Sequence, residues 1–269
     1  MWLAAIYGVA IGAVLGLTGA GGGILAVPAL VLGLHWTLPR ATPVALLAVG
    51  LAAAIGAADG LRRGLVRWRA ALLMAGLGIS LSPFGVRAAH ALPSSVLTSL
   101  FAMAMLASSA RLIVGSAKVD EGVERAAVSK KCMVDERTGR LRWTVLCAIT
   151  LAGIGTLSGL LTGMLGVGGG FLLVPAFRQW TSIGMQGVVA TSLLVVALIS
   201  LGAAASAVVG GAAVTSDGYG FIAAAMVGMA LGRLGARFVA GRWLQLGFGV
   251  LSAAVAVFML ARASAGPGS

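Results

Sequence analysis

A glycine-rich motif occurs twice in this chain, and an internal repeat of this kind limits the possible folds more than any other feature of the sequence. Residues 16–30 and 163–177 align without a gap over Gly-x-Gly-Gly-Gly, four apolar residues and Pro-Ala. The glycines of the motif are Gly19, Gly21, Gly22 and Gly23 in the first copy and Gly166, Gly168, Gly169 and Gly170 in the second. The sequence therefore predicts two homologous halves.

The composition indicates a membrane protein. Of the 269 residues, 59% are apolar and only 10% are charged, whereas soluble domains contain about 25% charged residues. The mean hydropathy is +1.05. The apolar stretches do not show the alternating pattern of a membrane β-barrel strand. We therefore predict an all-α integral membrane protein surrounded by a lipid bilayer.

Charge and cysteine content exclude several other classes. The formal net charge of +12 would suggest a nucleic-acid partner in a soluble protein, but the basic residues form short runs between apolar segments, which is the pattern that orients membrane helices. Cys132 and Cys147 have neither CxxC spacing nor a neighbouring histidine. We expect free thiols, no metal site, no other cofactor and no nucleic-acid partner.

Each glycine motif interrupts an apolar stretch. In the first half the two pieces are residues 2–17 and 24–34, and each is shorter than the roughly 20 residues that a spanning helix needs. We predict a helical hairpin broken at the glycines, followed by three transmembrane helices, in each half. The hydrophilic stretch between the halves carries mixed charges and is expected to be a solvated linker. The predicted boundaries are 1–115 for the first membrane repeat, 116–142 for the linker, 143–262 for the second repeat and 263–269 for a C-terminal tail.

The arginines favour inverted over parallel repeats. Four of them follow the second span of the first half, at Arg62, Arg63, Arg67 and Arg69, whereas the counterpart loop at 211–219 has none. In the second half, arginines stand at 178, 233, 237 and 242, where an inverted copy would place them in the cytoplasm. We expect a multi-pass protein of the cell membrane with both termini outside and the linker in the cytoplasm.

The broken helices indicate where a substrate would bind. Ends of half-helices that meet near the bilayer midplane are typical of transporters, and a helix N-terminus attracts anions. Glycines allow a close approach of the backbone, hydroxyls can donate hydrogen bonds, and an inward-pointing arginine can hold an oxyanion. Besides the eight motif glycines, the candidate binding residues are Thr18, Thr42, Thr191, Ser192, Arg87 and Arg237. The alternatives are glycines that only pack helices and arginines that reach for lipid headgroups.

At these residues the chain resembles the TauE/SafE family of permeases, also called the sulfite exporter and sulfonate uptake permease family. The resemblance depends on the doubled glycine motif, on the following Val27-Pro28-Ala29 and Val174-Pro175-Ala176, and on Ala-Thr pairs at 41 and 190. The second Ala-Thr pair stands two residues out of register with the glycines. The family implies a secondary transporter of sulfite, sulfonates or related sulfur-containing anions, with export as the expected direction.

Three alternatives remain open from the sequence. A passive anion channel would use the same architecture without coupling to an ion gradient. Asp59 and Asp217 are the only acids outside the linker, so one of them is a candidate for proton coupling. The third alternative is an intramembrane hydrolase, suggested by Thr156-Leu157-Ser158-Gly159. This element lacks the first glycine of a GxSG motif, and His35 and His90 lie near helix ends in the other half. We expect a transporter rather than an enzyme. The exact substrate and the oligomeric state do not follow from the sequence.

Overall fold

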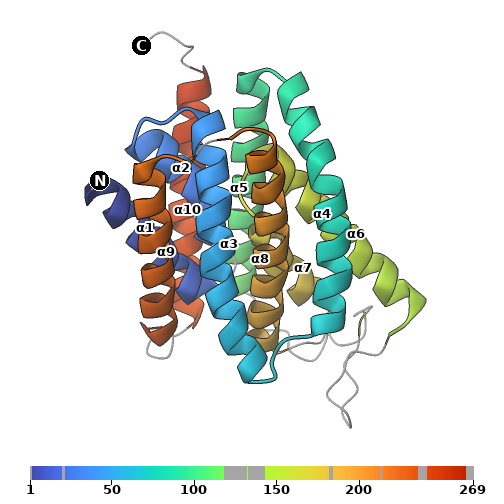
Figure 1. Ribbon diagram of the computed structural model, residues 1–269. Coiled ribbons are helices and arrows are strands. Elements are labelled where there is room, and N and C mark those ends of the chain that lie inside the picture. The colour runs from blue at the N-terminus through green and yellow to red at the C-terminus, as the bar shows by residue number, and fades with distance from the viewer. Residues whose placement is uncertain are drawn as a thin grey trace.

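The protein is a bundle of helices in the computed structural model, which describes residues 2–19, 22–117, 132, 143–181, 184–212, 214–235 and 241–264. Every helix or strand element among these residues is helical (Figure 1). The elements are α1 (Trp2–Thr18), η1 (Gly22–Leu25), α2 (Ala26–Pro28), η2 (Ala29–Gly33), α3 (Leu38–Arg62), α4 (Trp68–Ala91), α5 (Ser94–Ala117), α6 (Val145–Leu165), α7 (Gly170–Trp180), α8 (Met185–Val209), α9 (Ser216–Gly235) and α10 (Gly241–Ser264).

The all-α membrane fold predicted from composition is confirmed. Five helices in the described part of the chain are long and apolar enough to cross a membrane, and they are α3, α4, α6, α8 and α9. Four shorter apolar helical stretches accompany them, two of which are α1 and the segment after the first glycine turn. In the first half the glycine motif separates two short helical pieces, as expected. In the second half it separates the short α7 from α6, which has 21 residues and is long enough to span a membrane.

Two spans begin earlier than the sequence suggested. From the sequence, one span is expected to open at Thr42-Pro43, with Thr42 as its N-cap, and another at Ala190-Thr191. However, α3 starts at Leu38 with a proline in its first turn. Proline is tolerated there because the first N–H groups of a helix have no intrahelical partner. Likewise α8 starts at Met185 rather than at Ala190-Thr191. The threonines therefore lie in the second helical turn and are not N-caps.

The glycine motifs and the helix pair α3 and α8 share one constant offset. Gly16 and Gly163 are 147 positions apart, and so are the first residues of α3 and α8. These two helices also have equal lengths of 25 residues. This correspondence is consistent with an internal duplication. The offset of 147 aligns Thr42 with Val189. The pairing of Thr42 with Thr191, which the two Ala-Thr pairs suggest, is therefore two residues out of register.

Corresponding helices run in opposite directions. Gly50 of α3 lies against Leu201 of α8, and Gly60 lies against Ala190, so α3 and α8 are antiparallel neighbours (Figure 1). Parallel repeats would give corresponding helices the same direction. The arrangement is therefore consistent with the predicted inverted repeats and not with parallel ones.

Glycine stripes bring the two halves into backbone contact. A Cβ atom added at Gly155, Gly159 or Gly163 of α6 would stand 2.6 Å or less from the backbone of α4. The same holds for Gly8, Gly12 and Gly16 of α1, which lie against α9. Glycines spaced four residues apart let membrane helices approach this closely. Each broken hairpin is thus packed against the helix before last of the other half.

The cysteines form a disulfide, so the expectation of free thiols is wrong. Cys132 and Cys147 are bonded across a Cα–Cα distance of 5.0 Å. The backbone N–H of Cys132 donates to the carbonyl oxygen of Trp180 at 3.0 Å, so Cys132 lies beside the end of α7 as well as being bonded to the first turn of α6. The linker is therefore attached to the second hairpin at Cys132. The other residues of the predicted solvated linker, apart from 116–117 at the end of α5, lie outside the described part of the chain.

Candidate functional site

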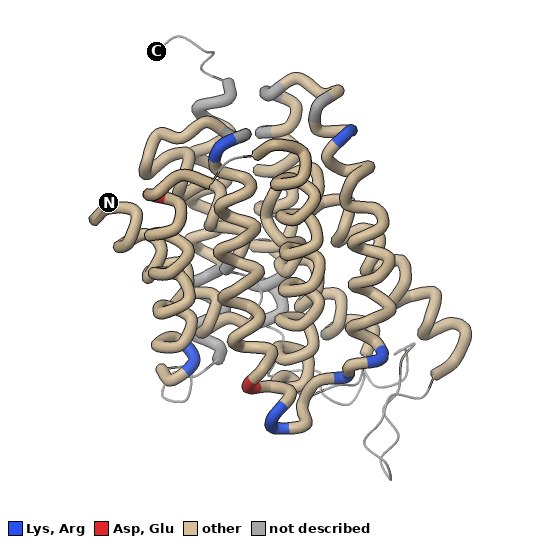
Figure 2. Tube along the Cα trace, viewed as in Figure 1, with Lys and Arg blue, Asp and Glu red and all other residues tan. Residues whose placement is uncertain are grey.

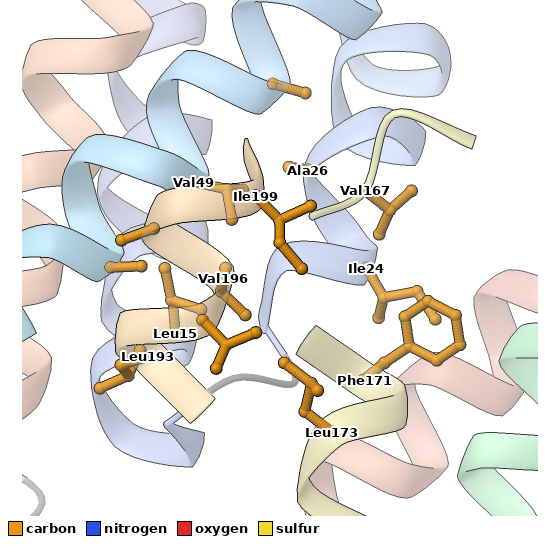
Figure 3. Close-up of a cluster of buried hydrophobic side chains, with 14 of the residues drawn as sticks. Leu15, Ile24, Ala26, Val49, Val167, Phe171, Leu173, Leu193, Val196 and Ile199 are labelled. Carbon is orange, nitrogen blue, oxygen red and sulfur yellow. The ribbon is translucent and has the colours of Figure 1, made fainter. Parts of the chain in front are cut away.

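The two glycine turns meet in the middle of the bundle between α3 and α8. A methyl group at Gly23 would stand 3.0 Å from the carbonyl oxygen of Val167, the residue between the second set of glycines, and 3.1 Å from Val49. Val49 and Val196 are counterparts under the constant offset, and both lie within 3.4 Å of the Cβ position at Gly168. Figure 3 shows this buried centre, with the two valines close to residues of both turns.

The second turn has a backbone that only glycine adopts readily. Gly166, Gly168 and Gly169 have φ values of 68°, 75° and 61°, in the left-handed region that costs other residues about 1–2 kcal/mol. A Cβ atom at Gly169 would also stand 2.2 Å from Ser158 Oγ. The turn is therefore held against α6 with no room for a side chain.

The two turns lead into different structures. Gly169 is the N-cap of α7, which continues for 11 residues. The first turn leads into a short 3-10 helix, then three α-helical residues and a π-helical turn. Aligned peptide dipoles and free N–H groups therefore face the centre from the second half. In the first half, Gly19 has a φ of 93° and Gly22 begins η1, whereas Gly21 lies outside the described residues.

The predicted hydroxyl residues are not gathered at one point. Thr42 packs on the second turn, since its methyl carbon lies 2.4 Å from the Cβ position at Gly166. Thr18 donates its hydroxyl to the carbonyl oxygen of Val14 in its own helix at 2.7 Å. The remaining two lie in the second turn of α8, where Thr191 accepts from the backbone N–H of Arg67 at 3.1 Å and Ser192 donates to Val189 at 3.0 Å.

Neither predicted arginine is placed at the glycine turns among the residues that the structure describes. Arg87 is exposed on α4, with its guanidinium carbon 5.7 Å from the centroid of the Phe84 ring. An exposed arginine over an aromatic ring has the geometry of an interfacial residue. Arg237 lies outside the described residues. The hydroxyl of Ser158, the proposed hydrolase nucleophile, is buried and donates to the carbonyl oxygen of Gly169 at 3.2 Å.

Asp59 forms a small ion-pair cluster. Its carboxylate oxygens accept from Arg63 Nε at 2.9 Å and from Arg233 Nε at 2.7 Å, which joins the end of α3 to the end of α9. The Asp59 side chain is 33% exposed, so each pair is expected to contribute only about 0.2–1 kcal/mol. The arrangement favours a structural role over the proton-coupling alternative.

Asp59→Asn is therefore expected to lower the thermal midpoint by only a few degrees and to leave transport and its pH dependence unchanged. Arg62→Ala, an exposed neighbour in the same turn, serves as the control. Thermal unfolding in detergent and flux in proteoliposomes measure the two effects. Loss of pH-dependent flux in Asp59→Asn alone would show that Asp59 carries protons.

Comparison with known proteins identifies the family. The family model described as "Sulfite exporter TauE/SafE" matches residues 4–259. The chain belongs to this family. Two relatives named "Probable membrane transporter protein", from Xylella fastidiosa strains 9a5c and Temecula1 / ATCC 700964, are each 28% identical to it over 198 and 192 residues. Each comparison covers 71% of this chain and 67% of the relative. No solved structure matches the chain.

Membership of the TauE/SafE family makes this chain a membrane transporter, as the glycine motifs predicted. Most of the candidate site predicted from the sequence consists of backbone groups of the motif glycines rather than of side chains. The sequence reasoning missed two buried hydroxyl residues near the second turn, Thr162 and Ser200, and considered Ser158 only as a nucleophile.

Proposed function

We propose that the protein is a secondary transporter of sulfur-containing anions, such as sulfite or a sulfonate, and that it exports them. The observation that carries this proposal is the N-terminus of α7, which opens at a glycine turn in the centre of the bundle, between the two halves. Such a helix end presents backbone N–H groups to an anion, and the family model is described as a sulfite exporter. The glycines of both turns and Thr42 are the proposed binding residues.

Alternating access follows from the arrangement of the two hairpins. The first hairpin reaches the centre from the end of the bundle where α3 begins, and the second reaches it from the end where α8 begins (Figure 1). Movement of one hairpin opens the centre to one side of the membrane while the other keeps it closed. This is the mode of transport expected for inverted repeats around a fixed site.

The basic residues support an orientation. Arg62 ends α3, and Arg63 and Arg67 lie in the loop between α3 and α4. Arg233 lies at the same end of the bundle, where Figure 2 shows most of the basic residues. By the positive-inside rule this end is cytoplasmic, which leaves both termini outside.

The Cys132–Cys147 disulfide argues for the opposite orientation. It joins the first turn of α6, at the end of the bundle where the arginines lie, and disulfides are rare in the cytosol. We give the arginines more weight because they are spread over several loops, whereas cytosolic thiols do form transient bridges. The proposal therefore implies that this bridge is open in growing cells.

Cysteine labelling tests the orientation. In a Cys132→Ser, Cys147→Ser background, Gly210→Cys is expected to react with a membrane-impermeant maleimide on intact cells, and Arg62→Cys only after permeabilisation. Both positions are exposed. The reverse result would overturn the orientation without affecting the proposed substrate.

Flux measurements test the function. Purified protein in proteoliposomes is expected to carry sulfite and methanesulfonate, but not chloride or nitrate. Protein-free liposomes serve as the control for leakage. If the protein carries none of these sulfur-containing anions, or carries all the anions alike, the proposed function is wrong.

A further inference from the structure

One hydroxyl beside the second glycine turn is buried without a partner. Ser200 of α8 is 0% exposed, and its Oγ forms no hydrogen bond with any residue that the structure describes. It is the atom nearest to the Cβ position of Gly168, at 2.6 Å. The hydroxyl therefore points into the turn that precedes α7. An unpaired buried hydroxyl costs free energy, so its presence needs an explanation.

A second hydroxyl, from α6, fixes the turn from the other side. Ser158 of α6 donates to the carbonyl oxygen of Gly169 at 3.2 Å, and Thr162 donates to the carbonyl oxygen of Ser158 at 2.7 Å. In a trans peptide the carbonyl and the following N–H point in opposite directions. Because the Gly169 carbonyl faces α6, the N–H of Gly170 points away from α6. The turn thus presents a fixed donor at the start of α7.

The first half builds a glycine turn without these hydroxyls. Under the constant offset, the counterparts of Ser158, Thr162 and Ser200 are Ile11, Leu15 and Ala53, all apolar. A glycine turn is built in that half as well, at Gly19. These three hydroxyls are therefore specific to the second half. We take the unpaired hydroxyl of Ser200 as an indication that a ligand binds there.

The second turn lacks a basic side chain among its described neighbours. The side chains nearest its glycines belong to Thr42, Val49, Ser158, Thr162, Val196 and Ser200. The donors in reach are backbone N–H groups, a hydroxyl and a helix dipole equivalent to about half a positive charge. Such a set can compensate one negative charge much better than two, because a buried excess charge is costly.

We propose that the turn before α7 binds a monovalent sulfur oxyanion, with Ser200 Oγ as a direct donor. The inference rests on the proposed function and narrows its substrate class to monoanions, namely sulfonates and hydrogensulfite. Sulfate and the sulfite dianion are expected to bind poorly. Ser158 is a positioning residue that acts through the Gly169 carbonyl. The glycines of the first turn contact the ligand and close the site, while its charge is held at the second turn.

Charge selectivity is tested with three anions in proteoliposomes. Methanesulfonate is a monoanion at any pH used, sulfate is a dianion, and sulfite changes between the two near neutral pH. We expect methanesulfonate to be carried at least about tenfold better than sulfate. Sulfite flux should rise as the pH is lowered through neutrality, in proportion to hydrogensulfite, after correction by the methanesulfonate flux at each pH. Equal transport of sulfate would contradict the inference.

The role of Ser200 is tested by Ser200→Ala, with Ser206→Ala as the matched control on the same helix. Ser206 is exposed and donates to its own helix at Gly202. Ser200→Ala should raise the KM for methanesulfonate by about tenfold or more, since a hydrogen bond to a charged group is lost. Its thermal midpoint without substrate should not fall, because no protein hydrogen bond is removed. Ser206→Ala should leave the KM unchanged.

The outcomes separate this inference from the proposed function. An unchanged KM in Ser200→Ala, or a lowered thermal midpoint with an unchanged KM, would refute the role of Ser200 while transport of sulfur-containing anions stands. A wild-type protein that carries none of the sulfur-containing anions would refute both.

Discussion

Gly169→Ala is expected to abolish transport while the protein still folds and inserts into the membrane. Alanine at a φ of 61° costs about 1–2 kcal/mol. Its methyl group would also stand 2.2 Å from Ser158 Oγ and 2.7 Å from the Ser158 carbonyl oxygen, which adds about 1–3 kcal/mol of overpacking. The turn would have to move away from α6, and the donor at the start of α7 would move with it.

Gly64→Ala is the control that separates strain from crowding. Gly64 has a similar φ of 66°, but a Cβ atom there would meet no atom within 4 Å. It should therefore show the strain cost alone and keep full transport. Sulfite flux and the thermal midpoint are measured for both variants. If Gly169→Ala transports as well as Gly64→Ala, the second turn is not part of the transport site.

Gly159→Ala is expected to destabilise the whole bundle. Its Cβ atom would stand 2.2 Å from the carbonyl oxygen of Gly78 and 2.4 Å from the Gly78 Cα. These are backbone atoms, so α6 and α4 would have to separate along their contact, at a cost of about 3 kcal/mol. We expect a strongly lowered thermal midpoint in detergent and reduced insertion.

Gly153→Ala gives the opposite expectation on the same helix. A Cβ atom at Gly153 would meet no atom within 4 Å, and alanine favours a helix over glycine by about 0.5–1 kcal/mol. The thermal midpoint should stay the same or rise. A similar loss of stability in both variants would contradict close packing of α6 on α4.

The helical membrane fold could be predicted because it follows from composition and from the lengths of apolar stretches. The broken hairpins could be predicted because a glycine run interrupts each apolar stretch, although α6, with 21 residues, is long enough to span a membrane by itself. The register of Thr42 could not, since the similar Ala-Thr pair at 190 misled the alignment. The offset fixed by the glycines was the better guide, and it pairs Thr42 with Val189.

Contacts between distant segments were missed for a different reason. The disulfide joins the linker to the first turn of α6, and neither spacing nor composition indicates that these segments meet. Ser200 lies on α8 and Ser158 on α6, and they become neighbours of one turn only in the folded bundle. A comparison of the halves at the glycine offset would have found them, as polar residues whose counterparts are apolar.

Counterflow tests the central claim, that this protein is a carrier of sulfur-containing anions rather than a channel. Proteoliposomes are loaded with unlabelled sulfite and diluted into a trace of labelled sulfite, with the membrane potential clamped at zero. A carrier that exposes its site to one side at a time is predicted to accumulate the label transiently above its equilibrium level. Label that only rises to equilibrium would contradict alternating access and indicate a passive channel.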